Sequence, residues 1–200
     1  MKRMCAMPMR SLRLMAIGLL VGGAAFSAPP IAHAINRTVS AARSKTIWAE
    51  WKRSFAQRSA QELSPQPGQP AFWLRVPTCQ LSVLAMHESD SEALHRFPAV
   101  RRIEINDGMV VSAHRDTHFR PLQKIHVGDL LLTESADGHV THYKVRTVRI
   151  LLPEEIVSAV GSPECREALH LLTCYPFRYF GAAPKRFLVT AFPVEEREGS

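Results

Sequence analysis

The sequence predicts an all-β domain that closes into a barrel, preceded by an N-terminal export or anchor segment and a short helix. From Ala71 onward, apolar residues gather in short runs rich in branched and aromatic side chains, which are typical of β-strands. Few amphipathic segments of helix length separate these runs, so alternating strands and helices are not expected. A closed barrel is favoured over a sandwich because closure leaves no unpaired edge strand.

The first element of the chain is an export segment over residues 1–34. A basic flank reading MKRMCAMPMRSLR is followed by the apolar stretch LMAIGLLVGGAAFSAPPIAHA. Its small residues Ala32 and Ala34 are typical of a cleaved signal peptide, whereas the basic flank is typical of a retained membrane anchor. Both outcomes remain open, with the anchor preferred. The continuous apolar core disfavours the third alternative, a mitochondrial presequence.

A helical stalk and a linker are predicted over residues 35–70. Trp48, Trp51 and Phe55 recur at helical spacing, with basic residues between them. This aromatic stripe suits either a stalk at the membrane surface or a helix that packs on the body, and the sequence does not separate the two. The proline-rich run SPQPGQP at 64–70 then ends any helix, because proline removes backbone donors.

The body is expected at residues 71–193, followed by a tail at 194–200. Asp137-Gly138 lies between two of the apolar runs and is typical of a tight turn, so residues 129–152 should form a β-hairpin. The predicted strands cover 72–77, 81–86, 109–114, 129–135, 139–152, 168–175 and 185–192.

The distribution of charge argues against nucleic-acid binding by the body. Residues 1–63 carry a net charge of +8, from ten basic and two acidic side chains. Residues 64–200 carry a net charge of −1, from 15 basic and 16 acidic side chains. Since binding to nucleic acid depends on a basic surface that neutralises phosphates, the body lacks the electrostatic requirement.

The four cysteines predict neither a disulfide framework nor a metal motif. Cys5, Cys79, Cys165 and Cys174 are unevenly spaced, and no two of them form a C-x-x-C pair. A structural zinc site is therefore not expected. Cys79 and Cys165 could pair in an exported protein, but separation along the chain does not give their distance in the fold.

Three reactive side chains lie at the ends of predicted strands: His114, Cys174 and Arg186. A cysteine thiolate attacks carbonyl carbons, and a histidine transfers protons near neutral pH. An arginine adds a permanent charge and a planar fork of donors that can stabilise an oxyanion. Each residue alone also has a structural explanation, because cysteines often fill cores and arginines often flank strands. On these residues alone, catalysis and ordinary packing both remain open.

Two longer segments carry a family resemblance. SAHRDTHFRPLQKIHVGDLLL and HLLTCYPFRYFGAAPKRFLVTA resemble the catalytic signature of the sortases, the cysteine transpeptidases of bacterial cell surfaces. The resemblance extends from Leu74 to Ala191 and is greatest to class D, although proteobacterial sortases share HRDTHF and TCYPF. It implies an eight-stranded β-barrel, with His114 as the catalytic histidine, Cys174 as the nucleophile and Arg186 as the active-site arginine.

Two departures from the family pattern concern the substrate groove. Sortases usually carry a glycine immediately before the catalytic histidine, where this chain has Ala113. They also usually carry a Gly/Pro-rich run with a Gly-Asn pair upstream, where this chain reads LHRFPAVRRIEINDGMV. Substrate choice is therefore not transferred from the family.

Two other motifs lack the chemistry that they would need. His114-Arg115-Asp116 matches the start of a kinase catalytic loop, but Pro121 stands where the metal-binding asparagine is required, and no Gly-rich phosphate loop occurs. Several histidines follow without a matched set of carboxylates or cysteines, so no catalytic metal is expected. Asp116 either orients a neighbouring side chain or serves as a turn residue.

The resemblance implies acyl transfer in two steps. Cys174 attacks the threonine carbonyl of an LPXT-like sorting signal, His114 protonates the departing amine, and an amine acceptor then resolves the thioacyl enzyme. Thr173 either contacts substrate or is only a β-branched strand residue. No organic cofactor is needed for this chemistry.

The expected partners are secreted proteins with a C-terminal sorting signal, an unidentified amine acceptor and, through the N-terminus, the membrane. The expected location is the outer side of the cytoplasmic membrane, or the secreted fraction if the signal is cleaved. Two alternatives stay open on the residues: a cysteine hydrolase, in which water resolves the intermediate, and an inactive envelope barrel that binds peptides.

Overall fold

The computed structural model describes residues 42–55, 57, 66–87, 97–103 and 106–194. The chain divides into two compact units, residues 1–41 and 42–200, and everything described below belongs to the second. The predicted export segment lies outside the described residues. Within the described ranges, no helix combines the length and the apolar character that crossing a membrane requires.

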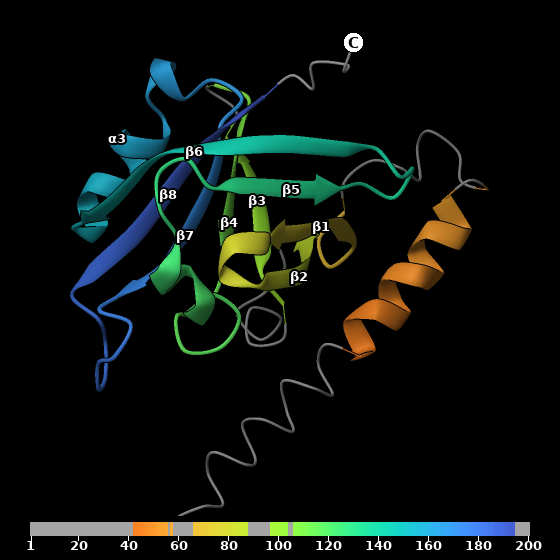
Figure 1. The fold of residues 1–200 in the computed structure, drawn as a ribbon, viewed down its shortest axis with the longest axis horizontal. Coiled ribbons are helices and arrows are strands. Elements are labelled where there is room, and N and C mark those ends of the chain that lie inside the picture. Colours follow the sequence, from red (N-terminus) through yellow and green to blue (C-terminus); the bar gives the residue numbers. More distant parts are fainter. Residues whose placement is uncertain (1–41, 56, 58–65, 88–96, 104–105, 195–200) are drawn as a thin grey trace, which may run out of the picture. The chain divides into compact units, whose positions relative to one another are not determined.

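Eight strands close into a barrel, which confirms the predicted fold class (Figure 1). Their order around the barrel is β1-β2-β3-β4-β7-β8-β6-β5. The strands are β1 (Pro70–Val76), β2 (Leu81–His87), β3 (Ala99–Ile103), β4 (Gly108–Ser112), β5 (Leu130–Glu134), β6 (Val140–Leu151), β7 (Leu169–Tyr175) and β8 (Lys185–Pro193).

The predicted hairpin at 129–152 is present as the antiparallel pair β5–β6, which lie side by side in Figure 1. Gly138 has a φ of +89°, a conformation that residues other than glycine rarely adopt, and its N–H donates to the carbonyl of Ser135 at 3.0 Å. The turn chemistry visible in the sequence therefore sets the register of these two strands.

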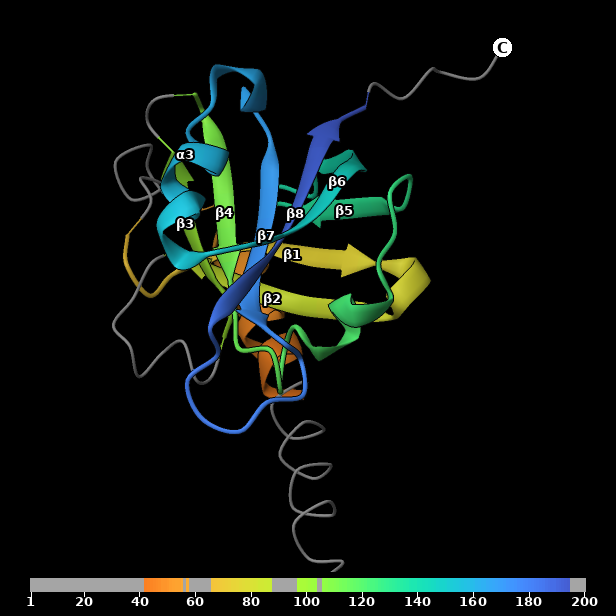
Figure 2. The same ribbon diagram turned by 90° about the vertical axis from the view of Figure 1, so that its left-hand side faces the viewer.

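Two pairs of neighbouring strands are parallel, β2–β3 and β4–β7. Parallel neighbours need a long connection, and the chain from β4 to β7 passes through β5 and β6 on the way. Figure 2 shows β4, β7 and β8 as adjacent strands of the barrel wall. This wall carries the side chains that the sequence singles out.

Alternating side chains along the strands fill the barrel interior. Burial of such apolar side chains is the main stabilising contribution, about 1.5–3 kcal/mol for each large aliphatic residue. The fully buried interior residues include Leu74, Val76, Val111, Leu131, Leu169, Leu171 and Val189.

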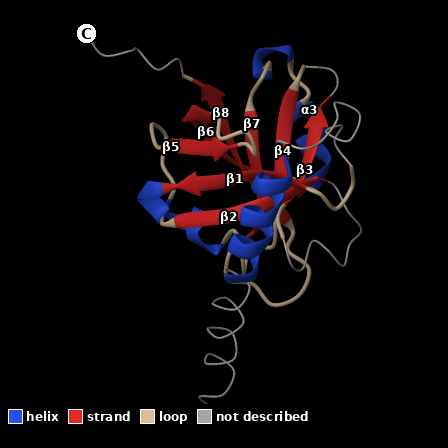
Figure 3. Ribbon diagram, turned by 90° about the vertical axis from the view of Figure 1, so that its right-hand side faces the viewer, coloured by secondary structure: helices blue, strands red, loops and turns tan. Residues whose placement is uncertain are grey.

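Short helices lie on the outside of the barrel (Figure 3). They are η1 (Pro77–Cys79), η2 (Arg120–Lys124), η3 (Pro153–Glu155), α3 (Ile156–Val160) and η4 (Pro163–Cys165). Val160 of α3 packs with Leu151 of β6 and Leu188 of β8 in a cluster separate from the interior core. This cluster covers the outer face of β7 and β8, beside the reactive residues.

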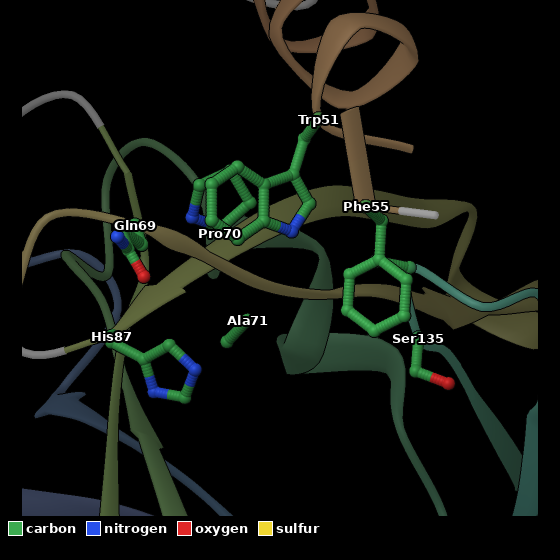
Figure 4. A pocket seen from close by; sticks show the side chains of 8 residues that line it. Trp51, Phe55, Gln69, Pro70, Ala71, His87 and Ser135 are labelled. Atoms are coloured by element: carbon green, nitrogen blue, oxygen red, sulfur yellow. The ribbon is translucent and has the colours of Figure 1, made fainter. Parts of the chain in front are cut away.

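A helix over residues 42–55 packs its aromatic stripe on the barrel. Trp48 is buried against Trp73, Leu84 and Met86. Farther along the helix, Trp51 and Phe55 project toward β1 and enclose, with His87 and its neighbours, a cavity of about 130 Å³ (Figure 4). Of the two interpretations of the stripe, the structure therefore favours packing on the body; the domain boundaries at residues 34, 70 and 193 stay predictions.

Candidate active site

The site is built on the antiparallel pair β7–β8, in which Cys174 lies directly opposite Arg186. Residues opposite one another share a face of the sheet, and the residues two positions away on each strand share it too. Leu172 and Leu188 occupy those positions and belong to the cluster beneath α3, outside the barrel. Cys174 and Arg186 therefore lie on the outer face of the wall.

The parallel pair β4–β7 brings His114 to the same place. Ser112 at the end of β4 pairs with Leu172, and the N–H of Ala113 donates to the carbonyl of Leu172 at 3.3 Å. The hydroxyl of Thr173 donates in turn to the carbonyl of Ala113 at 2.7 Å. Extending this register by two residues puts His114 beside Cys174.

One row on the outer face thus crosses four adjacent strands. It runs from His114 after β4, through Cys174 on β7 and Arg186 on β8, to Leu151 on β6, which pairs with Arg186. The three residues that the sequence singles out come from positions far apart in the chain, and the strand order brings them together. Each of the three is partly exposed, so a ligand can reach them from solvent.

The backbone around His114 is fixed by the turn that follows it. The N–H of Phe119 donates to the carbonyl of His114 at 3.1 Å, and Phe119 and Leu122 are fully buried in the core. Ala113, on the other side of His114, is also buried there. The Nε2 atom of His114 is itself shielded from solvent. The backbone is therefore held in place on both sides of His114.

Arg186 anchors the loop between β7 and β8. Its Nη1 donates to the carbonyl of Ala183 at 3.1 Å and to that of Lys185 at 3.0 Å. Among the described residues these are its hydrogen bonds, so the Nε and Nη2 donors of the guanidinium are left for a ligand. The fork can hold the loop and face a substrate oxygen at once.

Arg115 anchors the same loop from the other side of the site, a role that the sequence analysis missed. Its Nη2 donates to the carbonyl oxygens of Tyr179 and Gly181, at 3.0 Å and 3.1 Å. The available signal was its position directly after the reactive histidine. Asp116 is exposed within the turn, in agreement with its interpretation as a turn residue.

Three aromatic rings pack at the barrel end next to Cys174. The ring centroid of Phe187 lies 5.0 Å from that of Phe177 and 6.3 Å from that of Tyr175. The chain leaves β7 through a cis peptide bond between Tyr175 and Pro176. This packing ties the first residues of the β7–β8 loop to the interior and so supports the strand that carries the thiol.

The other described cysteines lie elsewhere and have different environments. Cys79 and Cys165 are free thiols, so the structure does not join them. Burial raises the pKa of both thiols, which disfavours the nucleophilic thiolate. In the described part of the chain, no group of three or more His, Cys, Asp or Glu side chains converges as a metal site would require.

Comparison with known proteins identifies the family of this chain. Residues 74–194, more than half of the chain, match the family model of the sortase domain. The chain belongs to the sortase family. Sortases are cysteine transpeptidases that act outside the cytoplasm at the cell envelope, and this sortase is accordingly a cell-surface transpeptidase. The predicted family, fold and enzyme class are thereby confirmed.

The relatives also confirm the predicted similarity to class D. Sortase D of Bacillus subtilis (strain 168) is 29% identical over 154 residues, which make up 75% of this chain and 73% of the relative. A Sortase D5 transpeptidase from Clostridium perfringens has the same fold, with a TM-score of 0.61 and 15% identity over 76% of this chain and 98% of that chain. Sortase A from Corynebacterium diphtheriae gives a TM-score of 0.57 and 14% identity over 96% and 97% of the two chains.

Proposed function

We propose that this sortase cleaves an LPXT-like sorting signal after its threonine, holds the product as a thioacyl enzyme on Cys174 and transfers it to an amine acceptor. The observation that carries the proposal is the register that sets Cys174 opposite Arg186, with His114 just after the end of the adjoining strand β4. A thiol, an imidazole and a guanidinium in one partly exposed row provide a nucleophile, a proton carrier and an oxyanion donor.

In the first step, the thiolate of Cys174 attacks the carbonyl carbon of the threonine, and the carbonyl oxygen becomes a tetrahedral oxyanion. When the C–N bond breaks, protonated His114 gives its proton to the departing amine. The products of this step are a thioester between Cys174 and the threonine, and the released C-terminal fragment of the substrate.

In the second step, an amine attacks the thioester carbonyl and loses a proton to neutral His114. The C–S bond then breaks, so an amide forms and the thiolate of Cys174 returns. His114 ends the cycle protonated, as it began. No electrons are transferred, and His114 regains in the second step the proton that it gave up in the first, so no cofactor is needed.

Arg186 stabilises both tetrahedral oxyanions through its Nε and Nη2 donors, while Nη1 keeps the β7–β8 loop in place. Thr173 acts as a positioning residue instead of a substrate contact. Its side chain is buried at 3% exposure, and its hydroxyl is engaged with the carbonyl of Ala113. These contacts support a role in holding the histidine strand beside the nucleophile strand.

The N-terminal segment serves as a retained anchor that keeps the barrel on the outer side of the cytoplasmic membrane. The basic flank before the apolar stretch supports this topology. Secreted proteins that carry a C-terminal sorting signal then reach the site, and a surface amine acts as acceptor. Alkaline extraction of membranes and protease accessibility in intact cells test the placement; a cytosolic barrel would contradict it.

The decisive experiment follows the products of a library of fluorescent sorting peptides by mass spectrometry, with and without added amines. Wild-type protein should give a Cys174-linked thioacyl adduct and, with an amine, an amide product. Cys174→Ala should give neither while keeping the wild-type melting temperature, because it removes the nucleophile and little volume. Cys165→Ala, which changes a thiol outside the row, is the matched control and should retain activity. Cleavage by folded Cys174→Ala would overturn the assignment.

A further inference from the structure

A second cavity, of about 350 Å³, lies between the helix over residues 42–55 and the barrel. Its barrel wall comes from β1, β2 and β5, whereas the row that contains Cys174 runs from the end of β4 across β7 and β8 to β6. The cavity is therefore a separate feature of the molecule. The residues that define its chemistry are Lys45, Trp48, Lys52, Trp73, Arg75 and Glu134.

The cavity carries an excess of positive charge. Three cations, Lys45, Lys52 and Arg75, face a single carboxylate, that of Glu134. Glu134 accepts from Lys52 at 2.9 Å and from Arg75 at 2.8 Å, so it is shared between them. Lys45 is exposed and forms no ion pair with a described residue. A doubly charged anion would neutralise this set.

One indole N–H of the cavity lining has no hydrogen-bond acceptor among the described residues. The two buried indoles that line it are at 5% and 6% exposure, with ring centroids 6.4 Å apart. Trp73 donates from Nε1 to the hydroxyl of Ser82 at 2.8 Å. The Nε1–H of Trp48, in contrast, is buried without an acceptor among the described residues. Buried donors are nearly always paired, so an unpaired indole N–H at a cationic cavity indicates a ligand with acceptor oxygens.

We propose that this cavity binds a phosphate group. Phosphate oxygens can accept a hydrogen bond from the Trp48 indole and form an ion pair with Lys45. The side chains of Lys52 and Arg75 supply further positive charge. Because Glu134 already orders them, they lose little conformational entropy on binding. Lys52 lies 5.7 Å from the ring centroid of Trp48, so the aromatic wall and the charge are adjacent. The phosphate can come from the headgroup of an anionic lipid or from a soluble phosphate compound, and both share this chemistry.

Tryptophan fluorescence provides a direct readout of the cavity. All three tryptophans of the chain lie on the helix or on β1, at residues 48, 51 and 73. The full chain in dodecyl maltoside micelles is titrated with inorganic phosphate at constant ionic strength. A parallel titration uses micelles doped with phosphatidylglycerol or with phosphatidylcholine. We expect a saturable change in emission with inorganic phosphate or with phosphatidylglycerol, and none with phosphatidylcholine.

Two variants and one control test which groups hold the phosphate. Trp48→Phe removes the N–H but keeps an aromatic ring, and should raise the dissociation constant about ten-fold, as expected for a hydrogen bond to a charged group. Lys45→Gln removes an exposed charge and should raise it about three-fold. Lys144→Gln, an exposed change on β6, is the matched control and should leave binding unchanged. All three variants should cleave sorting peptides at the wild-type rate, so this test is independent of the proposed function.

The outcomes distinguish a lipid headgroup from a soluble phosphate compound as the ligand. They also show whether the proposal fails. A response to phosphatidylglycerol alone assigns the cavity to a lipid headgroup, and a response to inorganic phosphate assigns it to a soluble compound. The proposal would be overturned if neither inorganic phosphate nor phosphatidylglycerol gave a saturable response. A loss of binding in Lys144→Gln equal to that in Lys45→Gln would overturn it as well, because the effect would then be one of general charge.

Discussion

The hydroxyl of Thr173 donates a hydrogen bond to the carbonyl oxygen of Ala113 at 2.7 Å, and both residues are buried. Thr173 precedes Cys174, and Ala113 precedes His114. One buried hydrogen bond therefore joins the two strands immediately before their reactive residues. Its length and burial make it a sensitive link between folding stability and the geometry of the site.

Thr173→Val should lower both stability and turnover. Valine has the shape of threonine but leaves the Ala113 carbonyl without its donor, at a cost of about 1–3 kcal/mol in the free energy of unfolding. Turnover should fall about ten-fold if the histidine strand shifts by a fraction of an ångström. Urea unfolding and steady-state cleavage of a sorting peptide measure the two effects. Thr173→Ser, which keeps the hydroxyl, should restore most of the turnover; equal losses in both variants would contradict the role of the hydrogen bond.

Arg186→Lys should be poorly tolerated although it keeps the charge. A lysine cannot bond the carbonyls of Ala183 and Lys185 and still present a planar pair of donors to an oxyanion. We expect kcat/KM to fall about 100-fold or more, as when an oxyanion donor is removed. Arg178→Lys, an exposed change in the same loop, is the control. Near-wild-type efficiency of Arg186→Lys would reduce Arg186 to a general source of positive charge.

Arg115→Gln should loosen the β7–β8 loop. The substitution removes the two bonds to the carbonyls of Tyr179 and Gly181, which cross from the histidine turn to that loop. Limited proteolysis within 178–183 should become faster, and KM for a sorting peptide should rise more than kcat falls. Asp116→Asn, an exposed neighbouring change, should have neither effect. An unchanged proteolysis rate in Arg115→Gln would show that the loop is held by other contacts.

Acidification should destabilise the barrel through His170. This residue is fully buried on β7, its Nδ1 lies 3.0 Å from the hydroxyl of Thr190, and burial lowers its pKa from 6.5 to about 4. As the pH falls below 6.5, the unfolded chain takes up a proton that the folded chain does not, so stability is lost progressively down to about pH 4. The loss can reach about 3 kcal/mol.

His170→Gln should remove this part of the pH dependence. Between pH 7.5 and 4, the unfolding free energy of wild type should therefore fall by up to about 3 kcal/mol more than that of the variant, whatever their difference at neutral pH. His126→Gln, which changes an exposed histidine, is the matched control. Parallel pH profiles for wild type and His170→Gln would rule out His170 as the source.

Turn chemistry and alternating burial made the barrel largely predictable from the sequence. Asp137-Gly138 predicts the β5–β6 turn because a glycine with positive φ is needed there, and the apolar runs of β1, β2, β7 and β8 predict strands. β3 was missed. Its sequence, Ala-Val-Arg-Arg-Ile, places two consecutive arginines where alternation should bring an apolar side chain, so the pattern alone does not reveal it.

The sequence singles out the candidate site residues, but it does not reveal the contacts that support them. His114, Cys174 and Arg186 belong to segments that resemble a family signature, whereas their juxtaposition depends on parallel pairing between β4 and β7. That pairing has no local signal, because the two strands are separated by a long stretch of chain. The loop bonds of Arg115 end on backbone carbonyls, which every residue possesses, and so leave no trace in the sequence.

The parallel pairing of β4 with β7 also sets when the site can form. Its two reactive ends, His114 and Cys174, are 60 residues apart in the sequence, and Arg186 follows later still. Contacts between such distant segments require loop closure and are therefore slow to form. A chain that is still emerging, or that is cut short before β8, therefore carries a cysteine without its partners, and thiol reactivity with a sorting signal should arise only once the last strand has joined the barrel.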